Sequence, residues 1–171
     1  MPKEYAINLP YPKLTGTLYP QDIRCIVDDY SGRAGELTAI TQYIYQQYIS
    51  HSFDEELAKE LLRIAIVEMH HHELLGEAIA QMGGDPIMGG STCFWSGSNV
   101  NYTKNPVTFL RNNIQAEYQA IANYRRSIAC VRNESLKELL ARIIMDEELH
   151  IEIFTQQLKR LTGEDSEGSQ S

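Results

Sequence analysis

Apolar side chains recur every three to four residues along four long stretches of this chain. This spacing is typical of α-helices that bury one face. Between the stretches the sequence is richer in glycine, proline and small polar residues, which favour turns and loops. The pattern predicts four helices, over residues 20–49, 54–82, 106–132 and 134–162.

Residues at the ends of these stretches support the assignment. Pro20 and Pro106 suit the first turn of a helix, where the missing N–H costs nothing. Asp54 and Asn133 are suited to cap the N-termini of the second and fourth helices. Gly163 is expected to end the last helix.

Two features break the regular pattern. Gly32 and Gly35 weaken the middle of the first stretch, so we expect a local irregularity just before Glu36. Residues 87–105 have no sustained periodicity, and so long a connection is uncommon unless the chain must travel. This connection would carry the chain along the length of the bundle, so that the third helix begins at the far end. The sequence therefore predicts an all-α fold, a four-helix bundle with one long crossover between helices 2 and 3.

At 171 residues the chain is most simply one domain. We expect residues 20–162 to form the bundle. Prolines 2, 10 and 12 predict that residues 1–19 form an extended N-terminal arm, over the bundle surface or onto a neighbouring subunit. Residues 163–171 are polar and predict a disordered tail.

The charge and hydropathy of the chain limit its partners. A formal net charge of -8 and a pI near 5.1 argue against nucleic acid and against an anionic membrane surface. No apolar run approaches the length that crosses a bilayer, and the first residues lack the core of a signal peptide. We therefore expect a cytoplasmic protein with no membrane partner.

The three cysteines are widely spaced and form no Cys-x-x-Cys pair: Cys25, Cys93 and Cys130. Their odd number and their spacing favour reduced, mostly structural thiols in a reducing compartment. A redox-active thiol is the alternative, but no resolving partner is visible nearby. The same absence excludes an iron–sulfur or zinc module of the paired-cysteine kind.

The candidate chemistry lies on the apolar faces of the helices. Glu68 and His71 are three residues apart, so a helix places them on one face within reach of one metal ion. Glu147 and His150 repeat the motif in the second half of the chain. The other two predicted helices each carry one glutamate on the apolar stripe. The candidate metal ligands, and with them the candidate catalytic residues, are Glu36, Glu68, His71, Glu117, Glu147 and His150.

A lone glutamate on a helix is usually solvated, and one Glu-x-x-His motif alone is weak. Four carboxylates on buried faces would be very costly unless their charge were neutralised. Two divalent ions would cancel that charge, and iron, manganese or zinc would suit carboxylate and imidazole ligands. From the helix order we expect Glu68 and Glu147 to bridge the ions and Glu36 and Glu117 to be terminal. Coordination positions would stay open for oxygen or peroxide.

Several residues near the ligands have weaker assignments. Asp146 could accept a hydrogen bond from His71 and fix its tautomer, whereas the matching position in the first motif is Val67. The two ions would therefore differ in their surroundings. Tyr43 and Tyr124 are expected to be buried structural residues, with hydrogen bonding at the site or electron relay as the alternative. The remaining histidines are expected to be flanking, on the surface or incidental: His51, His70 and His72.

The ligand motifs resemble those of the ferritin-like superfamily, in its bacterioferritin, rubrerythrin and manganese-catalase branches. The resemblance covers about residues 20–162 and fills all six ligand positions of the family. The residues that carry it are Gly35–Ile40, Val67–His71, Glu117 and Asp146–His150. The segment from Glu68 to Pro86 looks most like the manganese catalases and rubrerythrins. One departure is Ala120, where rubrerythrins typically carry an additional glutamate.

The resemblance implies a di-iron or di-manganese centre that reacts with oxygen or hydrogen peroxide. The leading hypothesis is an oxidoreductase that removes hydrogen peroxide as a peroxidase or in a catalase-like cycle. A peroxidase would need a separate electron donor. The alternatives are a ferroxidase that binds iron, and a non-enzymatic assembly protein stapled by its metal. The family also implies a homodimer or a larger homo-oligomer.

Overall fold

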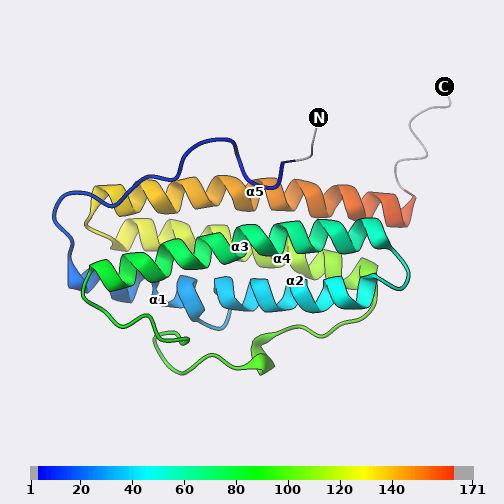
Figure 1. Ribbon diagram of the computed structural model, residues 1–171, viewed down its shortest axis with the longest axis horizontal. Helices are drawn as coiled ribbons and strands as arrows, with labels where there is room; N and C mark the ends of the chain where they lie inside the picture. The colour runs from blue at the N-terminus through cyan, green and yellow to red at the C-terminus, as the bar shows by residue number, and fades with distance from the viewer. Residues whose placement is uncertain (1–3, 164–171) are drawn as a thin grey trace.

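The computed structural model describes residues 4–163 and is built from long helices that run side by side (Figure 1). A short 3-10 helix, η1 (Pro20–Asp22), leads into α1 (Ile23–Ser31), which is followed by α2 (Glu36–Ser50). The other helices are α3 (Glu55–Gln81), α4 (Pro106–Cys130) and α5 (Glu134–Thr162). The closest packing joins α2 to α3 and α4 to α5. The predicted all-α four-helix bundle is confirmed, with α1 and α2 together forming its first member.

The predicted helix ends are found at the expected residues. The side chain of Asp54 accepts a hydrogen bond from the backbone N–H of Leu57, at 3.0 Å. Asn133 caps α5 in the same way, through the N–H of Leu136 at 2.8 Å. Gly163 follows α5 with φ 77°, a left-handed conformation that glycine adopts without strain. These caps satisfy N–H and C=O groups that a helix leaves unpaired at its ends.

The expected irregularity before Glu36 is a complete break in the helix. A side chain at Gly35 would meet the carbonyl oxygen of Asp28, since an added Cβ would lie 2.4 Å from it. Only glycine therefore permits the chain to turn back so tightly against the end of α1. The break makes Glu36 the first residue of α2.

The crossover between α3 and α4 runs along the outside of the bundle and includes the short helix η2 (Gly97–Asn99) (Figure 1). Hydrogen bonds from this crossover to side chains of α1 and α2 hold it in place. The indole N–H of Trp95 donates to the hydroxyl of Thr38 at 2.9 Å. The backbone N–H and the hydroxyl of Ser91 both donate to the carboxylate of Asp28, at 2.7 Å each. The loop therefore follows a fixed path beside α1 and α2.

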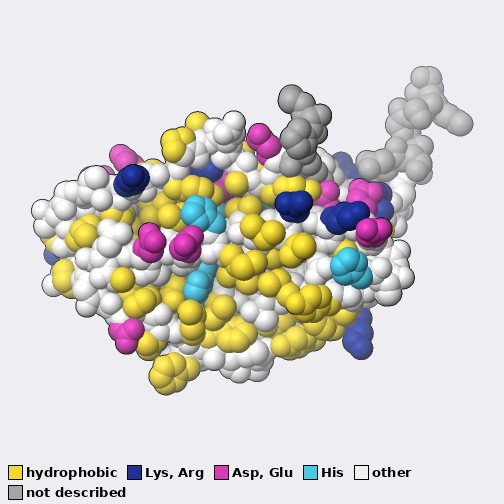
Figure 2. Space-filling model, viewed as in Figure 1, with side chains coloured by type: hydrophobic (Ala, Val, Ile, Leu, Met, Phe, Trp, Pro, Cys, Tyr) yellow, Lys and Arg dark blue, Asp and Glu magenta, His cyan; other side chains and the backbone are white. Residues whose placement is uncertain are grey.

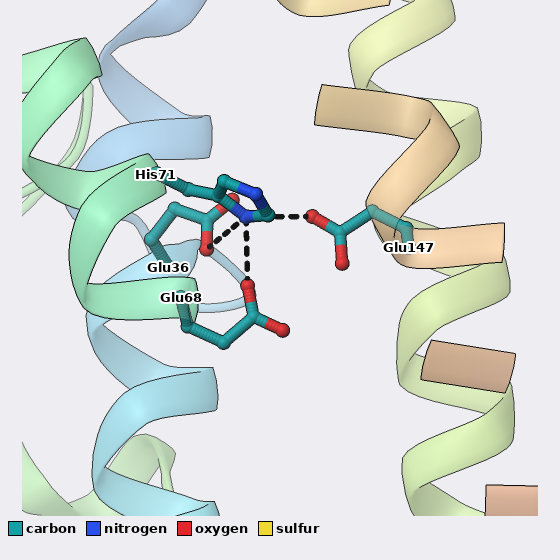
Figure 3. A group of neighbouring side chains, drawn as sticks. All are labelled: Glu36, Glu68, His71 and Glu147. Atoms are coloured by element: carbon teal, nitrogen blue, oxygen red, sulfur yellow. Dashed lines mark hydrogen bonds and ion pairs between the residues drawn. The ribbon is translucent and has the colours of Figure 1, made fainter. Parts of the chain in front are cut away.

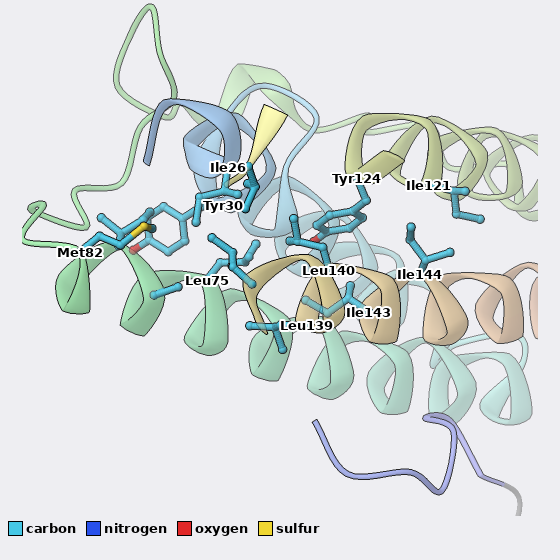
Figure 4. Packing of buried hydrophobic residues seen from close by; sticks show 14 of the residues in the cluster. Ile26, Tyr30, Leu75, Met82, Ile121, Tyr124, Leu139, Leu140, Ile143 and Ile144 are labelled. Atoms are coloured by element: carbon cyan, nitrogen blue, oxygen red, sulfur yellow. The ribbon is translucent and has the colours of Figure 1, made fainter. Parts of the chain in front are cut away.

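The apolar core consists of two clusters, one on each side of a polar middle layer. Figure 4 shows the first cluster, in which Leu75 of α3 and Leu140 of α5 are fully buried. The second cluster includes Leu61 of α3 and Phe154 of α5, also fully buried. Along α3 and α4 the candidate ligands lie between residues of the two clusters. Packing on both sides therefore holds the polar layer in place.

The N-terminal arm lies against α5 of its own bundle over its described residues, 4–19 (Figure 1). The backbone N–H of Thr15 donates to the Ser135 hydroxyl at 2.8 Å, and Arg142 donates to the carbonyl of Leu9 at 3.1 Å. Of the two paths that the sequence left open, residues 4–19 follow the one over the surface of their own bundle. The predicted disordered tail, apart from Gly163, lies outside the described residues.

The prediction of reduced thiols was wrong for two of the three cysteines. Cys25 of α1 and Cys130 at the end of α4 form a disulfide, with their Cα atoms 5.8 Å apart. The two are 105 residues apart in sequence, and they meet because α1 packs against α4. Cys93 is free and exposed. The cysteines therefore give no support for a reducing compartment.

Among residues 4–163, no helix combines the length and the apolar character that crossing a membrane requires.

Candidate metal centre

Four helices bring the six candidate ligands together in the polar middle layer. Each helix presents its ligand at the same level between the two apolar clusters. All six side chains are buried, with Glu36 the most accessible at 5% exposure. They come from α2 (Glu36), α3 (Glu68, His71), α4 (Glu117) and α5 (Glu147, His150).

The six residues form two overlapping groups. In the first, Glu36, Glu68, His71 and Glu147 each offer one ligand atom, and these atoms lie within 4.8 Å of one another (Figure 3). The second group has the same property and consists of Glu68, Glu117, Glu147 and His150. Glu68 and Glu147 belong to both groups, and these are the two residues expected to bridge. Glu36 and Glu117 belong to one group each, as expected of terminal ligands.

Hydrogen bonds on the far side of each imidazole orient both rings. Nε2 of His71 lies 3.0 Å from Oδ2 of Asp146, and Nε2 of His150 lies 2.9 Å from the carbonyl oxygen of Tyr5. A carbonyl oxygen can only accept, so Nε2 of His150 carries a proton. In the neutral ring, Nδ1 is then a bare nitrogen that faces the carboxylates. The Asp146 contact is the one that the sequence predicted.

The nitrogen and oxygen atoms that could ligate a metal are arranged as a pair of cations would require. Nδ1 of His71 lies 3.0 Å from an oxygen of Glu68, and Nδ1 of His150 lies 3.1 Å from an oxygen of Glu147. Lone pairs this close repel one another unless a proton or a metal ion lies between them. Oε1 of Glu68 and Oε1 of Glu147 are also buried and accept no hydrogen bond. His150 and His71 approach these two atoms to 2.9 and 3.3 Å, but without hydrogen-bond geometry.

The charge of the cluster has no other source of neutralisation among residues 4–163. The ion pairs of the four glutamates in this part of the chain are all with His71 and His150, and none is with a lysine or an arginine. Burial, followed by the charges of Glu68 and Glu147, raises the pKa of Glu36 well above its usual value. The pKa of Glu117 is raised for the same reasons. Burial disfavours the charged form of His71, but the neighbouring carboxylates outweigh it and raise its pKa. The metal-free cluster must therefore bind protons, which metal ions would displace.

Two tyrosines cross the site from one helix pair to the other. The Tyr43 hydroxyl on α2 donates to Oε1 of Glu117 at 2.5 Å, and the Tyr124 hydroxyl on α4 donates to Oε1 of Glu36. Both phenols are buried, as expected, but both also hydrogen-bond candidate ligands, which was the alternative interpretation. Each tyrosine thus contacts Oε1 of its glutamate, while Oε2 of Glu36 lies 3.8 Å from Nδ1 of His71.

A cavity of about 500 Å³ opens onto the carboxylate side of the cluster, between α2 and α4. All four glutamates and both tyrosines line it, whereas the two histidines do not. Small side chains widen it beside Glu117, namely Ala116 and Ala120 of α4. The cluster therefore has an open side with the carboxylates and a closed side with the imidazoles. The cavity has room for small molecules beside the carboxylates.

The structure also contains contacts that the sequence did not reveal. Tyr11 of the N-terminal arm donates to Oδ2 of Asp146 at 2.5 Å, and Arg142 pairs with Oδ1 at 2.7 Å. Burial alone would raise the pKa of Asp146, but hydrogen bonds, first of all from His71 and Tyr11, lower it to about 2. A carbonyl such as that of Tyr5 has no side-chain signature, so no sequence pattern could identify it.

The other histidines lie outside the site, in agreement with the sequence analysis. His70 is exposed and pairs with Glu73 at 3.0 Å. His72 is half-buried, stacks on the ring of Tyr30 and contacts the Ser31 hydroxyl at 3.0 Å. His51 is exposed in the turn after α2.

Comparisons with known proteins point to one family. A family model described as a ferritin-like domain matches residues 33–163. A bacterioferritin from Desulfovibrio desulfuricans is 32% identical over 123 residues, which cover 70% of this chain and 65% of that protein. The chain thus spans slightly less than two thirds of that relative. A probable manganese catalase from Clostridium acetobutylicum is 24% identical over 169 residues, covering 86% of this chain and 74% of that protein.

Solved structures give the same result. KatB, a manganese catalase from Anabaena PCC7120, superposes with a TM-score of 0.81 and 26% identity, over 91% of this chain and 79% of that chain. The bacterioferritin of Desulfovibrio desulfuricans, whose di-iron site was captured in different catalytic states, superposes with a TM-score of 0.68 and 25% identity. That match covers 87% of this chain and 86% of the other.

Proposed function

Because this chain belongs to the ferritin-like family, we propose that it holds two iron or manganese ions and removes hydrogen peroxide. The observation that carries the proposal is the pair of overlapping ligand groups that share Glu68 and Glu147. These two residues would bridge the ions. Glu36 and His71 would complete one position, and Glu117 and His150 the other. The manganese catalases among the relatives support peroxide as the substrate.

The bound ions would supply the redox chemistry, by gaining and losing two electrons between them as a pair. The protein residues would determine charge, access and proton positions. The four glutamates balance the charge of two divalent ions, so that the buried site is close to neutral. Tyr43 and Tyr124 each hold a proton at a carboxylate oxygen and thereby orient the terminal ligands. Peroxide would approach the carboxylates through the cavity. On the other sides of the site, the packed side chains of the bundle would exclude bulk water.

Two forms of peroxide removal are consistent with this site. In a catalase-like cycle, one peroxide is reduced to water and a second is oxidised to oxygen. In a peroxidase cycle, a separate donor supplies both electrons and protons. Neither form requires nucleic acid or a membrane, in keeping with the acidic chain.

A ferroxidase is the second candidate function, favoured by the bacterioferritin relative with its di-iron site. There the same ligands would bind Fe(II) and oxygen would oxidise it. A non-enzymatic assembly protein stapled by metal is less well supported. Metal sites that are purely structural are closed, whereas this cluster opens onto a cavity.

We also propose that the protein forms a homodimer or a larger homo-oligomer. Figure 2 shows hydrophobic side chains gathered over the face formed by α3 and α2. On α3, Leu62, Ile66 and Met69 follow one another at helical spacing and are 38%, 47% and 40% exposed. Contiguous exposed apolar side chains are typical of protein interfaces.

Metal analysis of natively purified protein, followed by a peroxide assay in an oxygen electrode, tests the function. Oxygen release from peroxide indicates catalase activity, and peroxide loss that requires an added reductant indicates a peroxidase. Oxygen consumption with Fe(II) and no turnover of peroxide would replace the proposal with the ferroxidase. Glu147→Gln should abolish the reaction, whereas Glu152→Gln, an exposed glutamate of the same helix, should not.

A further inference from the structure

The N-terminal arm runs antiparallel to α5 and reaches the closed side of the candidate metal centre. Asn133 at the start of α5 donates to the carbonyls of Thr15 and Thr17, at 2.8 and 2.9 Å. Further along α5, the carbonyl oxygen of Tyr5 lies 2.9 Å from Nε2 of His150. Lower residue numbers in the arm therefore meet higher numbers in α5. This direction brings residues 5–11 over both imidazole rings.

At His71 the arm completes the surroundings of an acid. Oδ2 of Asp146 receives hydrogen bonds from both His71 and Tyr11, at 3.0 and 2.5 Å. Oδ1 of Asp146 accepts a hydrogen bond from the backbone N–H of Ile7 and forms an ion pair with the guanidinium of Arg142, both at 2.7 Å. Each oxygen of Asp146 therefore has two polar partners, and two of the four, Ile7 and Tyr11, belong to the arm. The carboxylate cannot rotate without breaking several of these bonds.

At His150 the arm takes the place of an acid that the sequence lacks. Asp146 precedes Glu147 by one residue, and the matching position before Glu68 is Val67. Valine has no polar atom to offer a ring N–H. The carbonyl oxygen of Tyr5 accepts this bond instead, so the ring keeps the same orientation without the acid.

Arg142 fastens the arm at the point between these two contacts. Its guanidinium donates to the carbonyls of Ile7 and Leu9, at 2.5 and 3.1 Å, and lies over the ring of Tyr11, 4.3 Å from the centroid. Arg142 is itself buried and paired with Asp146. The arm, Asp146 and Arg142 are therefore one connected hydrogen-bonded unit, which is more rigid than any single contact.

We infer that residues 5–11 are a positioning element for both metal-binding histidines, and that the Tyr5 carbonyl substitutes for the acid absent at Val67. This inference rests on the proposed pair of metal ions. Groups that orient a metal-binding histidine typically change metal affinity 10–100-fold when they are lost. The two positions should also differ, because His71 is backed by a charged carboxylate and His150 by a neutral carbonyl. The ion beside His71 should therefore be held more tightly.

The test measures two metal dissociation constants in the full-length protein, with Mn(II) as the probe and a competing chelator. Glu36→Gln and Glu117→Gln identify which constant belongs to which position. Replacing residues 5–9 with alternating glycine and serine loosens the arm at constant chain length. The loosened arm should weaken both positions about 10-fold or more. Tyr11→Phe should weaken the His71 position selectively, and the exposed Tyr48→Phe should change neither.

Adding Val67→Asp to the loosened-arm variant separates positioning from a general loss of structure. The new carboxylate should restore affinity at the His150 position about 10-fold and leave the His71 position weakened. Circular dichroism of each variant checks that the bundle is folded. A folded loosened-arm variant with both wild-type constants would overturn the inference and leave the proposed function intact. Wild-type protein that binds no Mn(II) and no Fe(II) would overturn both.

Discussion

The hydroxyl of Tyr43 lies 2.5 Å from a carboxylate oxygen of Glu117, on the neighbouring member of the bundle. Tyr124 and Glu36 form the corresponding pair, so each half of the chain supplies a tyrosine to a buried glutamate of the other half. The two tyrosines thereby join α2 to α4 beside the cavity that both of them line.

The first prediction concerns this link. Tyr43→Phe should lower the free energy of unfolding of the metal-free protein by about 1–3 kcal/mol, because a buried carboxyl oxygen of Glu117 is left without its hydrogen-bond donor. Chemical denaturation at pH 7 measures the effect. Tyr48→Phe, which removes the hydroxyl of an exposed tyrosine, is the matched control and should change little. Equal stability of Tyr43→Phe and wild type would show that the contact has no energetic role.

Access through the cavity can be tested by filling it. Ala120 lines the cavity beside Glu117 and does not belong to either ligand group. Ala120→Leu should slow peroxide turnover severalfold while the metal content stays unchanged, because the larger side chain narrows the approach. Ala129→Leu, on the exposed surface of the same helix, is the control. Undiminished turnover in Ala120→Leu would mean that peroxide reaches the ligands by another path.

The buried carboxyl of Asp29 predicts a pH dependence of stability. Burial raises its pKa from 3.8 to about 6, against the opposing hydrogen bond from Ser127 at 2.5 Å. Between these two pH values the folded protein retains a proton that the unfolded chain has lost. The free energy of unfolding should therefore fall as pH rises from about 4 to about 6, by about 3 kcal/mol, and stay level above.

Asp29→Asn tests this assignment, because the amide does not titrate. The variant should be more stable than wild type at pH 7, and the difference should shrink toward pH 4. Urea denaturation across this range gives the comparison. A difference that is independent of pH would assign the dependence to other groups.

The disulfide should contribute measurably to stability. It joins residues 105 apart in sequence, and removing a native disulfide typically costs about 2–5 kcal/mol, with the larger values for long loops. The double variant Cys25→Ser, Cys130→Ser should show this loss in chemical denaturation. A reductant should destabilise wild type to the same extent and leave the double variant unaffected. Cys93→Ser should behave as wild type, since that thiol is free.

Much of the fold could be predicted because its determinants are local. The caps at Asp54 and Asn133 and the break at Gly35 each depend on residues within a few positions of one another. The candidate ligands could be found for a related reason. The spacing of Glu68 and His71 is set by the helix itself, and their place on an apolar stripe marked them as buried.

The features that sequence reasoning missed depend on distant parts of the chain. The Cys25–Cys130 bond arises only when α1 crosses α4. The contact between Tyr5 and His150 spans 145 residues and uses a backbone atom that every residue possesses. Position 67 indicated only that an acid was missing, and gave no sign of what replaced it.

The metal content of natively purified protein tests the central claim most directly, with Glu68→Gln and Glu152→Gln measured in parallel. If Glu68 serves both positions, wild type and Glu152→Gln should each hold two ions of iron or manganese per chain, and Glu68→Gln should hold fewer than one. A wild-type chain that holds no transition metal, or a Glu68→Gln variant that keeps both ions, would contradict the account.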